Sequence, residues 1–183
     1  MLRVALSFVL CLIVTAAFGQ GALDRVAVPG ARAVVLFFVA SDCPVSNRTF
    51  PEMKRVRESF ASQGVVVRYV YPNVGETAAG IRVHQREFDA GGVTLGDADG
   101  ALVRLTHAKV TPEAVVLVRS GAGGWKTVYA GRVDDRFVHL GQERPAATEH
   151  FVEAAVRSVL AGRPVVADPG GLVGCSIVSR GAR

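Results

Sequence analysis

Three short, mostly apolar runs stand out in the pattern of hydrophobic and polar residues. They cover residues 33–40 (AVVLFFVA), 65–70 (VVVRYV) and 114–118 (AVVLV). Runs of this length, rich in β-branched and aromatic side chains, are typical of strands that are covered on both faces. We therefore predict a buried sheet with these three runs at its centre.

Between and after these runs, apolar residues recur at helical spacing. The pattern predicts helices over residues 52–63, 76–88, 97–106 and 148–160, with Asp97 and Thr148 as N-caps of the last two. It also predicts a short strand at 93–95, a glycine-rich turn at 120–124 and an edge strand at 125–130. Because strands alternate with helices, we expect an α/β fold. Its central sheet should be mainly parallel, with an antiparallel C-terminal hairpin and helices on both faces.

The N-terminus has the three-part pattern of a secretory signal peptide. Met1 to Arg3 form a basic start, residues 4–17 are almost entirely apolar, and small residues lead up to Gly19. The apolar stretch is shorter than the ~20 residues that a membrane-spanning helix needs, although a retained anchor is the alternative. We expect a signal peptide over 1–19, a lead over 20–32, one domain over 33–162 and a Gly/Pro-rich tail over 163–183. A bacterial protein of this kind is periplasmic or secreted, without stable membrane insertion after cleavage.

Composition and charge narrow the range of functions. Half of the 183 residues are hydrophobic, which excludes a disordered chain. The net charge of +5 comes from basic residues that are scattered among acidic ones, so we expect no nucleic-acid partner. Of the three cysteines, Cys11 lies in the predicted signal peptide. The mature chain then carries Cys43 and Cys175, in a compartment where disulfides can persist.

Cys43 has the sequence context of a reactive thiol. It follows the first buried run, and Pro44 suits the first position of a helix. The free N–H groups and the dipole at a helix N-terminus favour a thiolate there. Asp42 opposes this effect, and Arg48, one turn further on, can offset Asp42. The alternative is a buried, inert cysteine at the end of a strand.

The element order, the Cys43-Pro44-Val45-Ser46 turn and Val110-Thr111-Pro112 before a core strand resemble the thioredoxin-like superfamily. More narrowly, SDCPVSNR, TPEAVVL and a late Gly-Cys resemble secreted bacterial redoxin or AhpC/TSA-type domain proteins. This resemblance implies the three-layer thioredoxin-like fold. It also implies a cis peptide bond before Pro112, facing Cys43, and it makes Thr111 and Arg48 candidates for substrate binding.

The chain also departs from this family at informative positions. Asp42 stands where thioredoxins have tryptophan, and Ser46 stands where they have the second cysteine of Cys-x-x-Cys. A local dithiol is therefore excluded. Leu36 and Ala40 occupy the positions of the peroxiredoxin proline and hydroxyl residue, so we do not expect a strong peroxidase.

The leading hypothesis is an exported redoxin that exchanges thiols and disulfides, or acts as a weak thiol peroxidase, through Cys43. Cys175 is the candidate resolving cysteine, and Glu113 is either a proton acceptor or a polar strand end. The expected partners are a thiol or disulfide protein, or a small peroxide, together with an external reductant. No cofactor is expected.

Two rival hypotheses remain open. Cys43 and Cys175 can form a structural disulfide that ties down the tail, or can stay unpaired. Alternatively, the domain is a non-enzymatic module that binds a partner protein or a soft metal such as Cu(I) or zinc. No metal ligand set is predicted, because none of the four histidines has a metal-binding spacing to a cysteine: His84, His107, His139 and His150.

Overall fold

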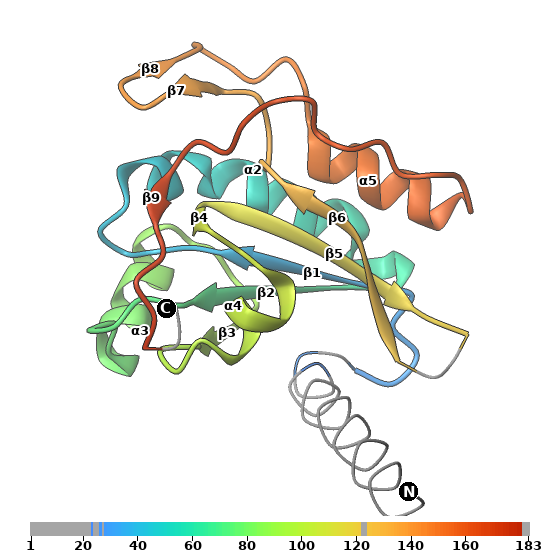
Figure 1. Cartoon of the computed structure of the whole chain (residues 1–183), viewed down its shortest axis with the longest axis horizontal. Coiled ribbons are helices and arrows are strands. Elements are labelled where there is room, and N and C mark those ends of the chain that lie inside the picture. Colours follow the sequence, from blue (N-terminus) through green and yellow to red (C-terminus); the bar gives the residue numbers. More distant parts are fainter. Residues whose placement is uncertain (1–22, 24–25, 27, 122–123, 181–183) are drawn as a thin grey trace, which may run out of the picture.

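The computed structural model describes residues 23, 26, 28–121 and 124–180; the predicted signal peptide and Cys11 lie outside this part. Its centre is a five-stranded sheet (Figure 1). In spatial order the strands are β3 (Val93–Gly96), β2 (Val65–Tyr71), β1 (Ala33–Phe38), β5 (Glu113–Arg119) and β6 (Trp125–Gly131). The three runs that the sequence places at the centre of a sheet are thus its three inner strands.

The sheet is mostly parallel, as predicted. Strands β1, β2 and β3 run in one direction, β5 runs antiparallel to β1, and β6 is antiparallel to β5. Residues 114–118 lie in β5, which runs back along β1 and forms the predicted antiparallel hairpin with β6. The link from β3 to β5 contains one helix, α4 (Ala101–Thr106), whose six residues rise about 9 Å, and the two-residue strand β4 (Val110–Thr111). This helix is too short to return the chain along a strand of ~20 Å, so β5 starts beside the end of β1 and runs back.

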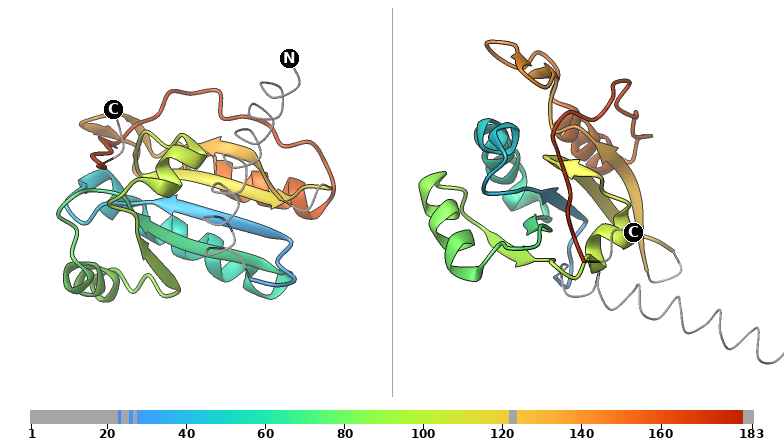
Figure 2. Two further views of the ribbon diagram at one scale, coloured as in Figure 1. Left: turned by 60° about the horizontal axis from the view of Figure 1, so that its bottom comes forward. Right: turned by 60° about the vertical axis from the view of Figure 1, so that its left-hand side comes forward.

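Helices cover both faces of the sheet, giving the expected three layers (Figure 2). On one face, α2 (Pro44–Phe60), α3 (Ala78–Glu87) and α5 (Phe151–Leu160) pack on Val35 and Phe37 of β1. On the other face, α4 packs on Val34 and Leu36. Alternate residues of β1 thus enter two separate cores, which explains why the whole strand is apolar. None of the described helices is long and apolar enough to cross a membrane.

The ends of three helices differ from the predictions. Helix α2 begins at Pro44, eight residues before the predicted start, and the 3₁₀ turn η1 (Ala61–Gln63) follows it. Helix α4 begins at Ala101, four residues after the predicted start, and its N-cap residue is Gly100 instead of Asp97. The Asp97 carboxylate nevertheless accepts hydrogen bonds from the amides of Leu102 and Val103 in the first turn. Thr148 does not cap α5, which begins at Phe151. Its hydroxyl donates to Asp135 instead, so a tertiary contact replaces the predicted cap.

The C-terminal tail returns across the molecule to the carboxyl end of β1. It forms β9 (Cys175–Ser176), which pairs antiparallel with β4 (Val110–Thr111) (Figure 1). Further hydrogen bonds fix the tail on both sides of β9. They run from Arg132 to Asp168, from the Ile177 amide to the Lys109 carbonyl, between Val178 and both Asn73 and Val74, and from the Arg180 amide to the Ala98 carbonyl. A small hairpin of β7 (Phe137–His139) and β8 (Gln142–Glu143) precedes α5.

Candidate functional site

Cys43 lies where β1 ends and α2 begins, as the sequence predicts. It is the N-cap residue of α2, with Pro44 at the first helical position, and is 1% exposed. Its thiol donates to the Thr111 carbonyl oxygen at 3.0 Å, and the Thr111–Pro112 peptide bond is cis. The fold therefore brings Cys43 and the proline loop together, in the arrangement that the resemblance implies.

Cys175 completes this group from the far end of the chain. Strand β9 places it opposite Thr111 in the register with β4, and it packs against Cys43 beside Phe137. Both cysteines are free thiols. Gly174 permits this approach, because a Cβ at this position would lie 2.3 Å from the Thr111 carbonyl oxygen. The tail thus covers the Cys43 turn with a second cysteine.

The two thiols differ in acidity. Burial opposes ionisation of Cys43, but hydrogen bonds from the Cys175 thiol and from the Ser46 amide favour its thiolate. These hydrogen bonds outweigh burial and lower the pKa of Cys43 from its ordinary value. Burial raises the pKa of Cys175 to about 12, reinforced by its hydrogen bond to Cys43 and by the negative charges of Cys43 and Asp42. Cys43 is therefore the more acidic thiol of the pair, and Cys175 is the one that keeps its proton to higher pH.

The other predicted residues are engaged by different partners. The Glu113 carboxylate accepts from the amides of Lys109 and Val110, at 2.7 and 3.2 Å, and burial raises its pKa. It therefore holds the loop that leads to Pro112. Arg48 pairs with Glu143 at 2.6 Å on the surface. The buried Ser46 hydroxyl lies 3.4 Å from the Ala40 amide, from which it accepts a hydrogen bond.

No large pocket opens directly at the sulfur among the described residues. A cavity of about 10 Å³ lies beside Pro112, Val45 and Phe137, which is room for about one water molecule. Cys43 is thus closed to molecules larger than water in this arrangement of the tail.

Two polar residues at the Cys43 turn were not predicted as site residues from the sequence: Asn47 and His84. Asn47 lies four residues after Cys43, and its side chain links the turn to the buried His84 of α3. A signal for His84 exists in the sequence. It follows Ile81 by three residues and therefore falls on the apolar face of its helix, where a polar side chain needs a partner.

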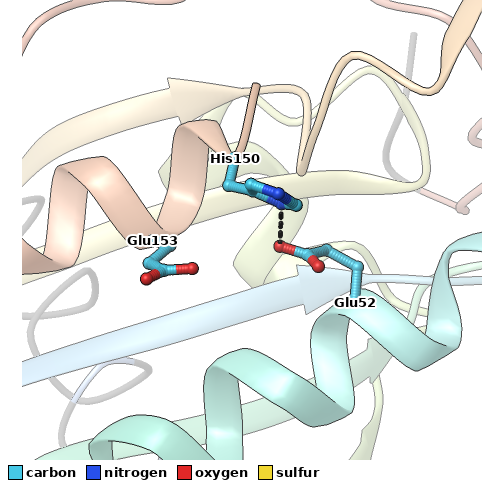
Figure 3. Close-up of side chains that lie close together, drawn as sticks. All are labelled: Glu52, His150 and Glu153. Atoms are coloured by element: carbon cyan, nitrogen blue, oxygen red, sulfur yellow. Dashed lines mark hydrogen bonds and ion pairs between the residues drawn. The ribbon is translucent and has the colours of Figure 1, made fainter. Parts of the chain in front are cut away.

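One group of metal-type ligands lies away from the cysteines. Glu52, His150 and Glu153 have side-chain ligand atoms within 4.8 Å of one another, where α2 meets the start of α5 (Figure 3). Arg55, however, pairs with both carboxylates, and Arg157 also pairs with Glu153. The cationic position between the acids is thus filled by a guanidinium, and this group is an ion-pair network between two helices.

Comparisons with known proteins agree with this architecture. No protein-family model and no curated protein sequence matches the chain. Among solved structures, an uncharacterized conserved protein from Geobacillus kaustophilus has a TM-score of 0.68 and 23% identity, over 83% of this chain and 79% of its own. A hypothetical protein from Sinorhizobium meliloti 1021 also has a TM-score of 0.68, with 22% identity over 92% of this chain and 85% of its own.

A third structure carries a functional description. It is a candidate thiol:disulfide interchange protein, DsbE, from Chlorobium tepidum, with a TM-score of 0.52 and 20% identity over 77% of this chain and 83% of its own. At these identities the likeness concerns the fold. With its three layers, its Cys43 turn and its cis-proline loop, the chain has the thioredoxin-like fold.

Proposed function

We propose that this chain is an exported thioredoxin-like redoxin that exchanges thiols and disulfides through Cys43, with Cys175 as the resolving cysteine. The observation that carries the proposal is the delivery of Cys175 by β9 to the Cys43 sulfur, next to Pro112. A cysteine in a tail could lie anywhere on the surface. Here the tail is hydrogen-bonded before and after β9, so that the second thiol is held at the first.

The reaction consists of two exchanges. The Cys43 thiolate attacks one sulfur of a substrate disulfide, forms a mixed disulfide and expels the other substrate sulfur as a thiolate. The Cys175 thiolate then attacks the Cys43 sulfur, forms the Cys43–Cys175 disulfide and expels the second substrate thiolate. The substrate gains two electrons and the protein loses two. An external dithiol of lower potential reduces the protein again.

The coupling of the two thiols orders these steps. While Cys43 is a thiolate, its charge and its hydrogen bond help to hold the pKa of Cys175 near 12. When Cys43 enters a mixed disulfide, both influences disappear and Cys175 ionises more readily. The resolving thiol is thereby activated only after the first exchange has taken place.

The proposal retains peroxides as a minor substrate class. The Cys43 thiolate would take one peroxide oxygen as a sulfenic acid and release an alcohol or water, and Cys175 would condense with it and release water. We rank disulfides first, because Leu36 and Ala40 replace the peroxiredoxin proline and hydroxyl residue. Export is part of the proposal because of the pattern of residues 1–19. N-terminal sequencing of the protein from the cell envelope tests it, and an intact Met1 in the cytoplasmic fraction contradicts it.

The test is a reaction with a chromogenic aromatic disulfide in a Cys11→Ser background. The reduced protein should release two aromatic thiolates and become an intramolecular disulfide by mass. Cys175→Ser should release one and keep the adduct on Cys43, and Cys43→Ser should lose the fast phase. Equal rates for Cys43→Ser and its parent would overturn the proposal. So would a Cys43–Cys175 disulfide that resists reduction by a dithiol, or stoichiometric copper or zinc retained under reducing conditions, because these outcomes identify a structural disulfide or a metal-binding module.

A further inference from the structure

His84 is a polar side chain enclosed almost entirely by aromatic rings. It is 4% exposed and lies edge-on to Phe50 and Tyr71, with ring centroids 5.1 and 5.7 Å away. The ring of Phe88 lies 4.8 Å away on a third side. A hydrocarbon ring would occupy this position without the cost of burying two nitrogen atoms. Packing alone therefore does not account for an imidazole here.

Both ring nitrogens are used in a directed chain of hydrogen bonds. The Asn47 amide nitrogen donates to the Ser41 carbonyl at 3.2 Å, which turns the Asn47 oxygen toward His84 Nε2 at 2.9 Å. Nε2 must then carry the proton. Nδ1 accepts from the Tyr71 hydroxyl at 2.8 Å, whose oxygen accepts from Gln85 at 2.6 Å. Every donor has an acceptor when the imidazole is neutral, and burial lowers the pKa of His84 in the same sense.

The chain of hydrogen bonds ends at the turn that carries Cys43. Ser41 precedes Cys43 by two residues and Asn47 follows it by four, so the bond between them closes the turn around the cysteine. Glu76 fixes Ser41 from the other side, since its carboxylate oxygens accept from the Ser41 amide and hydroxyl, each at 2.9 Å. Within the same turn, the Asn47 amide donates to the Cys43 carbonyl oxygen at 3.0 Å. The Ser46 amide is one of the groups that lower the pKa of Cys43.

We infer that His84 is a positioning residue for Cys43: through Asn47, which bonds to both Ser41 and Cys43, it holds residues 41–47 in the turn that fixes the position of the sulfur. The imidazole acts on the thiol through the shape of the turn, without touching the sulfur or the substrate. Its consequence for turnover rests on the proposed function, whereas its consequence for the thiol does not.

Two substitutions at His84 separate hydrogen bonding from packing. His84→Phe keeps an aromatic ring but removes the donor to Asn47, and His84→Gln keeps an N–H donor. Alkylation of the Cys43-containing peptide, followed by mass spectrometry across a pH range, reports the thiolate directly. For His84→Phe we expect roughly tenfold slower alkylation below the midpoint of the profile, which is the effect of misdirecting one hydrogen bond to a charged group. His84→Gln should restore most of the wild-type profile.

Further variants control for a general loss of stability. Tyr71→Phe removes the hydroxyl that serves Nδ1 and leaves the link to Asn47 in place, so it should lower stability but keep the midpoint of the Cys43 profile. Asn47 is half-buried. Asn47→Leu should slow alkylation of Cys43 as much as His84→Phe does. The double variant should be no slower than either single variant, because both break the same link.

The inference is overturned if His84→Phe and Asn47→Leu keep the wild-type profile, or if Tyr71→Phe shifts it equally. Failure of the proposed function gives a different result. In that case the wild-type protein does not turn over disulfides, while the effect of His84 on alkylation of Cys43 persists.

Discussion

A single substitution at Gly174 should disturb the contact between the tail and the proline loop that faces Cys43. A Cβ at this position would lie 2.3 Å from the Thr111 carbonyl oxygen and 2.8 Å from its carbon, and both are backbone atoms. Neither can rotate away, so Gly174→Ala must push β9 off β4 by about an ångström. Cys175 is the next residue and has to move with it.

The size of the effect follows from the cost of overpacking. Forcing an extra methyl group into a close contact costs about 1–3 kcal/mol. If that cost falls on the docked tail, the equilibrium constant for closing the Cys43–Cys175 disulfide drops by roughly 5- to 150-fold. For this two-electron couple, the reduction potential then rises by roughly 20–65 mV. Alkylation of Cys43 in the reduced protein should become faster, because the strand that covers it is displaced.

The assay is equilibration with a series of dithiol/disulfide buffers, with the two forms separated by mass after acid quenching. Gly171→Ala is a matched control, since a Cβ there would meet none of the described atoms within 4 Å, although the residue belongs to the same tail. Gly171→Ala should keep the wild-type potential. If Gly174→Ala also keeps it, the contact between β9 and β4 does not set the proximity of the two cysteines, and the resolving role of Cys175 loses its structural basis.

Three further predictions concern the thiols, the tail and the core. Because the pKa of Cys43 is lowered and that of Cys175 is raised to about 12, Cys43 should react with an alkylating agent at pH values where Cys175 is inert. Overlapping pH profiles of the two alkylated peptides by mass spectrometry would contradict this. Asp168→Ala removes the pair with Arg132 and should speed proteolysis of the tail. Burial raises the pKa of Asp168, but the hydrogen bonds from Arg132 outweigh burial and lower it from its ordinary value. The wild-type tail should therefore loosen on acidification, as the pH falls through this lowered pKa. Phe50 is 1% exposed, and its ring stacks on that of Tyr69 with centroids 5.5 Å apart. Phe50→Ala should lower the free energy of unfolding by about 3–5 kcal/mol in urea titrations, and Phe50→Leu should lower it less.

The inner strands could be predicted because each is buried on both faces. In β1 all six residues are buried, with alternate side chains in two different cores, and this produces an uninterrupted apolar run. The direction of β5 could not be predicted, because a run of apolar residues looks the same in either direction. It depends on the length of the link that contains α4, and the sequence pattern there marks a helix without showing where the next strand starts.

The position of Cys43 could be predicted from the sequence, whereas Cys175 could be named as its candidate partner but not placed. Cys43 owes its position to adjacent segments, since strand, cysteine, proline and helix follow one another along the chain. The position of Cys175 depends on contacts with residues more than 60 positions away. Strand β9 has only two residues and no apolar pattern, so its pairing with β4 leaves no periodic signal. The same holds for Asn47 and His84, which lie 37 residues apart and meet only in the fold.

Ser46 explains why the tail is needed at this site. In a Cys-x-x-Cys turn the second thiol is held near the first by one turn of helix, at little cost in conformational entropy. Here the Ser46 hydroxyl accepts from the Ala40 amide and offers no sulfur. The partner thiol must come from a segment whose ordering costs about 1–2 kcal/mol per residue in backbone entropy, and the pairs at Asp168, Lys109, Asn73 and Ala98 offset that cost. Under the proposed function, the redox balance of Cys43 is coupled to docking of the tail, and we expect any perturbation that releases β9 to shift the protein toward its dithiol form.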